Sequence, residues 1–203
     1  MIVFGTQNRK KGIELGEVFA PLGIELKTLA DFPNALSVEE NGDSFAANAK
    51  LKAVEQARHL GLWVLGEDSG LAVDALGGAP GIYSARFSGQ DATDAKNNAL
   101  LLERMKDLPL EKRGAHYVCH MALAAPDGSI HAESEGRCGG RILLAAKGAG
   151  GFGYDPLFEV VEYHQTFGEL SPLVKTCLSH RARAARLLIP QLRRLLDVLG
   201  RRT

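Results

Sequence analysis

The sequence has few cysteines, and their spacing suits neither cross-links nor a metal site. Its 203 residues include three, Cys119, Cys138 and Cys177, and none belongs to a Cys-x-x-Cys pair. The odd number and wide separation argue against a disulfide framework and against a zinc site. Because this usage is typical of a reducing compartment, we expect a cytoplasmic protein.

The sequence also lacks an excess of charge and a long apolar run. Lys plus Arg number 24 and Asp plus Glu number 24, so no global field attracts nucleic acid or an anionic membrane. An anionic ligand must therefore be small and held by a local cluster. No stretch reaches the roughly 20 apolar residues of a membrane span, and residues 1–5 lack the basic start of a signal peptide. We expect one domain over residues 1–203, with no nucleic-acid or membrane partner.

Two adjacent carboxylates follow a short apolar run. Residues 62–65 predict a buried strand, and Gly66-Glu67-Asp68-Ser69-Gly70 comes next. This order places Glu67 and Asp68 at a strand end, where open α/β sheets bind ligands, and adjacent side chains of an extended segment point in opposite directions. One carboxylate is a candidate to hold a cation or deprotonate a water, and the other to anchor a turn. A plain Asp-Ser-Gly turn without chemistry is the alternative.

A polar, basic turn follows the first predicted strand, residues 1–5. It reads Thr6-Gln7-Asn8-Arg9-Lys10-Lys11 and leads into a helical pattern through Ile13 and Phe19. Backbone N–H groups and lysines at a helix N-terminus favour phosphate. The turn lacks the glycines of a P-loop, so a solvated helix start is the alternative.

Other patterns predict the remaining elements. Residues 24–29 predict a second strand, and Asp43 or Ser44 is expected to cap a helix through residues 45–57. Thr93 or Asp94 is expected to cap a helix over residues 95–105. Residues 115–125 and 129–138 alternate around Pro-Asp-Gly, which predicts a hairpin and an antiparallel part of the sheet.

Two later stretches are candidates for binding a flat ligand. The glycine-rich loop of residues 148–158 carries Phe152, Tyr154 and Asp155. A ring flanked by glycines is accessible for stacking, worth on the order of 1–3 kcal/mol for a nucleobase, although the ring could instead fill a gap against the sheet. Lys175 and His180-Arg181 lie near the start of the last helix, which Ser179 caps, and such donors suit a phosphate or a carbonyl-bearing base.

Taken together, five motifs resemble the inosine and xanthosine triphosphate pyrophosphatase family. The motifs fall in the family's order and span nearly the whole chain: Thr6-Gln7-Asn8-Arg9-Lys10-Lys11, Glu67-Asp68-Ser69-Gly70-Leu71, residues 77–86, residues 150–158 and Ser179-His180-Arg181. The resemblance implies an α/β fold with a long mixed β-sheet, flanking helices and two lobes around a central active-site cleft. It also implies a homodimer.

The resemblance further implies a reaction and the residues that carry it. The reaction is hydrolysis of ITP, dITP and XTP to the nucleoside monophosphate and pyrophosphate, with Mg²⁺. Asp68 is the implied general base, and Glu39 and Asp68 are the implied metal ligands. The implied substrate-binding residues are those of the first turn (Thr6, Gln7, Asn8, Arg9, Lys10 and Lys11), Lys52 and Ser69, and those around the base (Phe152, Gly153, Tyr154, Asp155, Lys175, His180 and Arg181).

Three positions depart from the family pattern. Glu67 stands where bacterial members usually have Asp, Ala47 where many have Glu, and Gln7 where Gly is common. The loss of a carboxylate at position 47 implies looser metal binding if that position normally holds the metal. Two alternatives follow: a related pyrophosphatase for pyrimidine or modified nucleotides, and a nucleotide-binding protein with weak catalysis.

Overall fold

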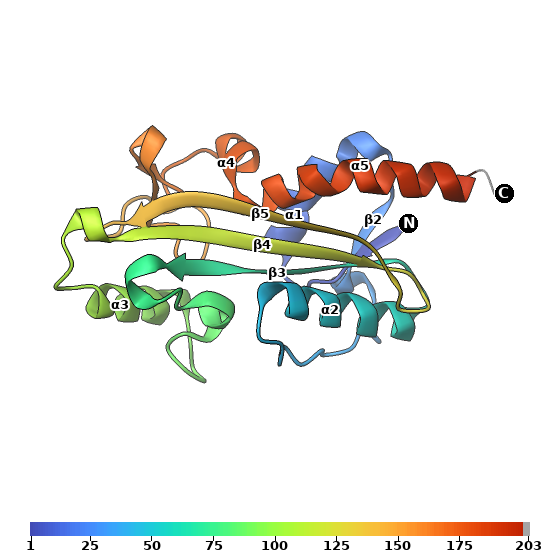
Figure 1. The fold of residues 1–203 in the computed structure, drawn as a ribbon, viewed down its shortest axis with the longest axis horizontal. Coiled ribbons are helices and arrows are strands. Elements are labelled where there is room, and N and C mark those ends of the chain that lie inside the picture. Colours follow the sequence, from blue (N-terminus) through green and yellow to red (C-terminus); the bar gives the residue numbers. More distant parts are fainter. Residues whose placement is uncertain (201–203) are drawn as a thin grey trace. The chain divides into compact units, whose positions relative to one another are not determined.

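The computed structural model describes residues 1–200, without the side chains of Arg9, Lys10, Leu199 and Gly200. Within these residues the fold is α/β, with one seven-stranded sheet in the order β2-β1-β3-β4-β5-β6-β7 (Figure 1). The strands are β1 (Ile2–Phe4), β2 (Leu26–Thr28), β3 (Val64–Val73), β4 (Gly114–Ala124), β5 (Ile130–Ile142), β6 (Phe158–Val160) and β7 (Gln165–Thr166). The α-helices are α1 (Arg9–Phe19), α2 (Phe45–Leu60), α3 (Asp94–Arg104), α4 (Pro172–Leu178) and α5 (His180–Gly200).

The sheet is mixed. β1 pairs in parallel with β2 and β3, whereas β6 pairs antiparallel with β5 and β7. Short 3₁₀ helices occupy Ala20–Leu22, Leu29–Asp31, Asp74–Leu76, Gly81–Arg86, Leu110–Lys112 and Val161–Tyr163. The predicted mixed sheet with flanking helices is therefore confirmed.

The chain divides into two compact units, and β3, β4 and β5 contribute residues to both. The first unit comprises residues 1–68, residues 119–136 and the chain from His180 onward. The second comprises residues 69–118 and 137–179. The predicted single domain, and the predicted cleft between two lobes, stay predictions.

In the first unit the sheet is covered by helices on both faces. The alanines of α2 (Ala49, Ala53 and Ala57) pack with Val64 of β3 and Ala122 of β4. On the other face of the sheet, Leu65 of β3 and Cys119, Met121 and Leu123 of β4 pack against α1 and α5. These two helices lie side by side (Figure 1). This alternation is the two-residue period of a strand, so each strand has one face for each helical layer.

Helix α2 lies unusually close to β3, and a glycine permits it. A Cβ on Gly66 would stand 2.2 Å from the carbonyl oxygen of Ala49 and 2.7 Å from the nitrogen of Ala53. No larger residue fits without moving the helix away from the strand. The contact matters because Asp68 lies two residues beyond Gly66, on the same face of the strand.

The second unit has its own core. Leu71 and Val73 of β3, Leu101 of α3, and the rings of Tyr117, Phe158 and Phe167 are all buried in it. Tyr117 lies edge-on to Phe158, with ring centroids 4.8 Å apart, and is stacked on Phe167 at 5.8 Å.

Most predicted elements are confirmed, including the predicted caps of α2 and α3. Ser44 accepts a hydrogen bond from the nitrogen of Ala47, and Thr93 accepts one from Lys96. The predicted turn at Asp68-Ser69-Gly70 is wrong, because β3 runs without a break from Val64 to Val73. Leu65 and Leu71 are both fully buried, and one continuous strand buries both, so tertiary packing overrides the local turn preference.

Candidate active site

Glu67 and Asp68 occupy the middle of β3 and make contacts on opposite faces of the sheet. The Glu67 carboxylate pairs with Lys11 at 2.8 Å and Arg181 at 3.0 Å. The Asp68 carboxylate pairs with Lys52 of α2 at 2.9 Å and accepts a hydrogen bond from Asn48 at 3.3 Å. The expectation that the two carboxylates would point in opposite directions is thus confirmed, although they lie within a strand and not at its end.

Lys52 joins Asp68 to a second carboxylate. Its ammonium contacts Asp68 at 2.9 Å and Glu40 at 3.1 Å. Burial works to lower the pKa of Lys52, but Asp68, Glu40 and Glu67 outweigh it, so the pKa is raised. Burial raises the pKa of Asp68 above its ordinary value, and the charge of Lys52 only partly opposes this. Asp68 is therefore a carboxylate with more proton affinity than one in water, as a general base requires.

Glu67 is the centre of a second buried charge cluster. Its Oε1 accepts hydrogen bonds from Nε and Nη2 of Arg181 at 3.2 and 3.0 Å, and from the Cys119 thiol at 3.4 Å. Nη1 of Arg181 reaches Glu14 of α1 at 2.6 Å. Burial lowers the pKa of Arg181, but the two carboxylates outweigh it and raise the pKa. Arg181 thus remains charged and ties α1 and α5 to β3.

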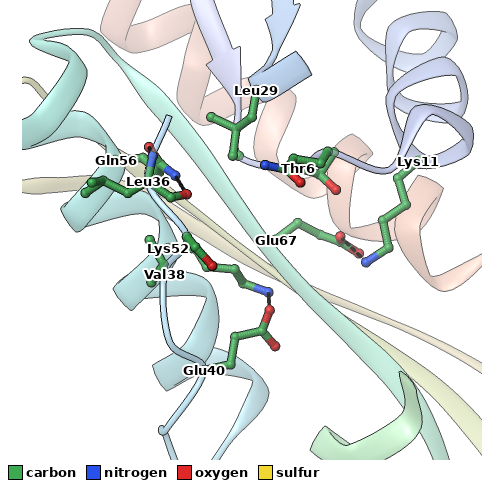
Figure 2. Close-up of a pocket in the computed structure, with 12 residues that line it drawn as sticks. Thr6, Lys11, Leu29, Leu36, Val38, Glu40, Lys52, Gln56 and Glu67 are labelled. Carbon is green, nitrogen blue, oxygen red and sulfur yellow. Dashed lines mark hydrogen bonds and ion pairs between the residues drawn. The ribbon is translucent and has the colours of Figure 1, made fainter. Parts of the chain in front are cut away.

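A polar cavity of about 240 Å³ lies beside these clusters in the first unit. Figure 2 shows Lys11 directed toward Glu67 at one part of it, and Lys52 directed toward Glu40 at another. Twelve residues line the cavity: Gly5, Thr6, Gln7, Lys11, Leu29, Leu36, Ser37, Val38, Glu40, Lys52, Gln56 and Glu67. The lining contains two lysines, each paired with a glutamate of the same lining, and the exposed turn at the start of α1, so it suits a small anion that takes the place of a glutamate beside a lysine.

The turn between β1 and α1 is held by its own side chains. Thr6 Oγ1 accepts a hydrogen bond from the nitrogen of Asn8 at 3.1 Å, and Asn8 Oδ1 accepts one from the nitrogen of Lys11 at 3.4 Å. These bonds order the first turn of α1, whose positive end favours phosphate. Thr6, Gln7 and Lys11 line the cavity, whereas the side chains of Arg9 and Lys10 lie outside the described residues.

One face of α2 builds the opposite wall. Asn48, Lys52 and Gln56 follow each other at intervals of four residues, so they share a face of the helix. Asn48 accepts a hydrogen bond from the nitrogen of Gly42 at 2.8 Å. The Gln56 side-chain amide donates a hydrogen bond to the Leu36 carbonyl at 2.6 Å and accepts one from the Leu36 nitrogen at 3.2 Å. The helix thereby fixes the irregular segment of residues 36–42 that carries Glu40.

A different kind of cluster forms in the second unit. Asp155 Oδ2 accepts hydrogen bonds from Lys175 at 2.7 Å and from the nitrogen of Phe152 at 2.9 Å, and Oδ1 accepts one from Tyr117 at 3.4 Å. The Lys175 ammonium also lies 4.7 Å from the centre of the Phe152 ring. Burial raises the pKa of Tyr117 well above its ordinary value, and the charge of Asp155 adds to the effect. The loop that carries Phe152 is therefore built around a buried carboxylate.

Comparison with known proteins identifies the family. The Ham1 family matches residues 2–191. The chain belongs to the Ham1 family. A dITP/XTP pyrophosphatase of Rhodopirellula baltica is 52% identical over 97% of this chain and 94% of its own length. One from Desulforamulus reducens is 47% identical over 98% of this chain and 96% of its own length.

A solved Ham1 structure agrees with the fold. The HAM1 protein of Coxiella burnetii superposes with a TM-score of 0.87 at 35% identity, covering 95% of this chain and 98% of that one. The resemblance inferred from the five motifs is thus confirmed as membership of the Ham1 family.

Within this Ham1 protein the predicted site residues fall into two groups. Thr6, Gln7, Lys11, Lys52 and Asp68 gather in the first unit, around or beside the cavity. Phe152, Gly153, Tyr154, Asp155 and Lys175 gather in the second. His180 and Arg181 are buried at the start of α5 in the first unit, and Ser69 is half-buried in β3. Arg181 pairs with carboxylates, so its assignment to the base stays a prediction.

Sequence reasoning missed three contributors to the first group. Glu40 lines the cavity, whereas its neighbour Glu39 is exposed, and Glu39 as a metal ligand stays a prediction. Asn48 and Gln56 were also missed. The four-residue spacing of Asn48, Lys52 and Gln56 is a signal that could have found them.

The carboxylates of the first unit fit a divalent cation that arrives with a phosphate ligand. Glu40 and Asp68 converge on one ammonium, that of Lys52, which holds the place of a cation between them. Proteins commonly bind Mg²⁺ through one or two carboxylates plus substrate phosphates. No group of three or more His, Cys, Asp or Glu side chains among the described residues is placed to hold a metal. Ligand phosphates would therefore have to complete the coordination.

No helix in the described part of the chain is long and apolar enough to cross a membrane.

Proposed function

We propose that this protein hydrolyses the non-standard purine nucleotides ITP, dITP and XTP to the nucleoside monophosphate and pyrophosphate, which keeps them out of DNA and RNA. One observation carries the proposal: a buried carboxylate, Asp68, is held by Lys52 beside a polar cavity, in a chain 52% identical to a dITP/XTP pyrophosphatase. The enzyme is a nucleoside triphosphate pyrophosphatase, and its substrate partner is a small nucleotide.

Asp68 acts as the general base. Its ionised carboxylate takes a proton from a water molecule, whose oxygen attacks the α-phosphorus. The bond from that phosphorus to the oxygen bridging to the β-phosphorus then breaks, and pyrophosphate leaves with that oxygen. Burial raises the pKa of Asp68, which strengthens it as a base, and the hydrogen bond from Asn48 fixes its orientation.

The first turn and Lys52 hold the triphosphate. Thr6, Asn8 and Lys11 supply hydroxyl, amide and ammonium groups at the positive end of α1, with Gln7, Arg9 and Lys10 in the same turn. Lys11 now pairs with Glu67, so phosphate binding replaces one anionic partner of this ammonium by another. Positioning and charge stabilisation are the main tasks in phosphoryl transfer.

Mg²⁺ is the proposed cofactor. Asp68 would hold it, with Glu39 as the ligand predicted from the family pattern and Glu40 as the carboxylate that shares Lys52 with Asp68. When bound, the ion neutralises negative charge that develops on the phosphate oxygens. Ala47 supplies no carboxylate, so the metal relies more on the phosphates.

The base is read by the residues of the glycine-rich loop and its neighbours. Phe152 stacks on the purine, Gly153, Tyr154 and Asp155 shape the pocket, and Ser69 touches the substrate. Lys175, His180 and Arg181 are proposed to favour the 6-oxo group of hypoxanthine and xanthine, because that oxygen accepts hydrogen bonds from such donors and the amine of adenine does not. The family resemblance supports a homodimer. The cysteine usage supports a cytoplasmic location.

The test is pyrophosphate release from ITP, dITP, XTP, GTP, ATP and dTTP, each with and without Mg²⁺. We expect metal-dependent release confined to the hypoxanthine and xanthine nucleotides. Release mainly from dTTP would contradict the purine preference. ITP binding without any release would contradict the enzyme assignment.

A further inference from the structure

The loop that carries Phe152 has a second set of anchors, supplied by α3. The backbone nitrogen of Gly153 donates a hydrogen bond to Asp94 Oδ2 at 2.7 Å, and the Gly153 carbonyl accepts one from Asn98 Nδ2 at 3.0 Å. Asp94 and Asn98 are four residues apart, so they share one face of α3. Both polar groups of the residue that follows Phe152 are thus held by one helix.

The orientation of the Asn98 amide follows from this contact. Nδ2 must face the Gly153 carbonyl, because Oδ1 in that place would set two acceptors against each other. Oδ1 is buried and has no hydrogen-bond partner among the described residues. A buried acceptor without a partner is costly, so the orientation that lets Nδ2 bond Gly153 carries the cost of leaving Oδ1 without a hydrogen bond.

The backbone of this loop needs outside support. Gly151 and Gly153 have positive φ angles, +75° and +61°, and glycine leaves such segments many conformations to lose. Asp155 secures Phe152, whose nitrogen donates to Oδ2 at 2.9 Å and whose carbonyl accepts from the Asp155 nitrogen at 3.2 Å. Loss of the bonds from Asp94 and Asn98 would leave the peptides on either side of Gly153 less restrained, and with them the backbone that carries the Phe152 ring.

We infer that Asp94 and Asn98 are positioning residues for the Phe152 ring and hence determinants of affinity for the nucleobase. They act through the Gly153 peptide and touch neither the phosphates nor the base. A ring held in place before the ligand arrives loses less conformational entropy on stacking. The inference rests on the proposed function, in which Phe152 stacks on the purine.

The primary test is the kinetics of Asn98→Ala with ITP. We expect KM to rise about fivefold, the factor expected for one ordinary hydrogen bond, with kcat nearly unchanged. Asn98→Asp, which keeps the shape but sets a carboxylate oxygen against the Gly153 carbonyl, should raise KM more than Asn98→Ala. Asp94→Asn should give a smaller rise, because the amide oxygen still accepts from Gly153. Glu103→Ala, an exposed change on the same helix, is the matched control and should leave KM unchanged.

Two further measurements separate positioning from general loss of structure. Inorganic tripolyphosphate has no base, so its inhibition constant should be the same for Asn98→Ala and the parent. In a Phe152→Ala background, Asn98→Ala should add little to KM, because the ring on which it acts is gone. Additive effects of the two substitutions, or equal weakening of tripolyphosphate, would overturn the inference. Failure of the parent protein to hydrolyse ITP would instead overturn the proposed function.

Discussion

The two units solve the problem of buried charge in different ways. In the first, Glu67, Asp68 and Glu40 are matched by Lys11, Lys52 and Arg181 beside a polar cavity. In the second, the ion pair of Asp155 with Lys175 lies beside the rings of Phe152 and Phe167, and its carboxylate also holds a backbone nitrogen. The lysines beside the cavity can exchange a carboxylate for an incoming anion. The Asp155 carboxylate instead fixes the shape of a loop.

This difference predicts that substitutions at Asp68, Lys52 and Lys11 of the first unit change catalysis and phosphate affinity, whereas those at Phe152 of the second change only affinity for the base.

The largest effect is expected for Asp68→Asn. The amide cannot take a proton from water, so kcat for ITP should fall roughly 10²–10⁴-fold, the usual contribution of a general base. Thermal unfolding should show a folded protein, because burial already disfavours the charged form of Asp68. Asp127→Asn, in an exposed hairpin turn, is the matched control. An Asp68→Asn protein with full pyrophosphate release would remove Asp68 from the mechanism.

The next largest effect is expected for Phe152→Ala. Loss of one base-stacking contact, worth about 1–3 kcal/mol, should raise KM for ITP roughly 5- to 150-fold. The inhibition constant of tripolyphosphate should not change, whereas Lys11→Ala should weaken both ligands. Tyr83→Ala, which removes an exposed ring of the same unit, serves as the control. If Phe152→Ala weakened tripolyphosphate as much as ITP, the division of labour between the units would be wrong.

A pH profile tests the charge balance of the first unit. The positive charge of Lys52 lowers the pKa of Asp68 against the larger effect of burial. Lys52→Met removes that charge, so the pKa of Asp68 should rise further, and the acidic limb of kcat/KM should move to higher pH. Lys50→Met, two residues earlier in α2 with its ammonium on Glu133, should leave the limb in place. The measurement is kcat/KM for ITP from acid to neutral pH, and a downward shift would contradict the stated role of Lys52.

Stability should respond to Lys52 with a definite sign. The folded pKa of Lys52 is raised, so its contribution to the free energy of unfolding is present below the ordinary value of 10.5 and is lost as pH rises through the folded value. Asp68 acts in the same sense at lower pH, because its raised pKa means that folding becomes less favourable as pH rises above its ordinary value of 3.8. Urea unfolding of Lys52→Met and its parent should therefore converge at strongly alkaline pH.

Local patterns predicted what depends on neighbours in the sequence. The caps Ser44 and Thr93, and the helices that they begin, follow from short-range chemistry. The predicted Asp-Ser-Gly turn is wrong because residues on both sides of residue 68 are buried, and this burial favours a continuous strand. The local preference of these residues for a turn does not reflect burial elsewhere in the chain.

Long-range pairings lay beyond the sequence. Glu67 and Arg181 are 114 positions apart, and which carboxylate an arginine meets depends on how helices cross the sheet. The same limit applies to Glu40, which lines the cavity although the resemblance points to its neighbour Glu39. Both precede the helix, and only the path of an irregular segment decides which one enters the cavity.

The smallest effect is expected where α2 fixes that segment. Gln56→Leu keeps the size of the side chain but removes both hydrogen bonds to Leu36. These bonds hold the segment of residues 36–42 and not the ligand itself, so the inhibition constant of tripolyphosphate should rise only about fivefold, as for one ordinary hydrogen bond. Glu55→Ala, an exposed change next to it on α2, should have no effect. Since the loop carrying Phe152 belongs to the other unit, Gln56→Leu should weaken ITP and tripolyphosphate by the same factor. A loss confined to ITP would mean that the segment of residues 36–42 helps to bind the base, and the contrast between the two units would no longer hold.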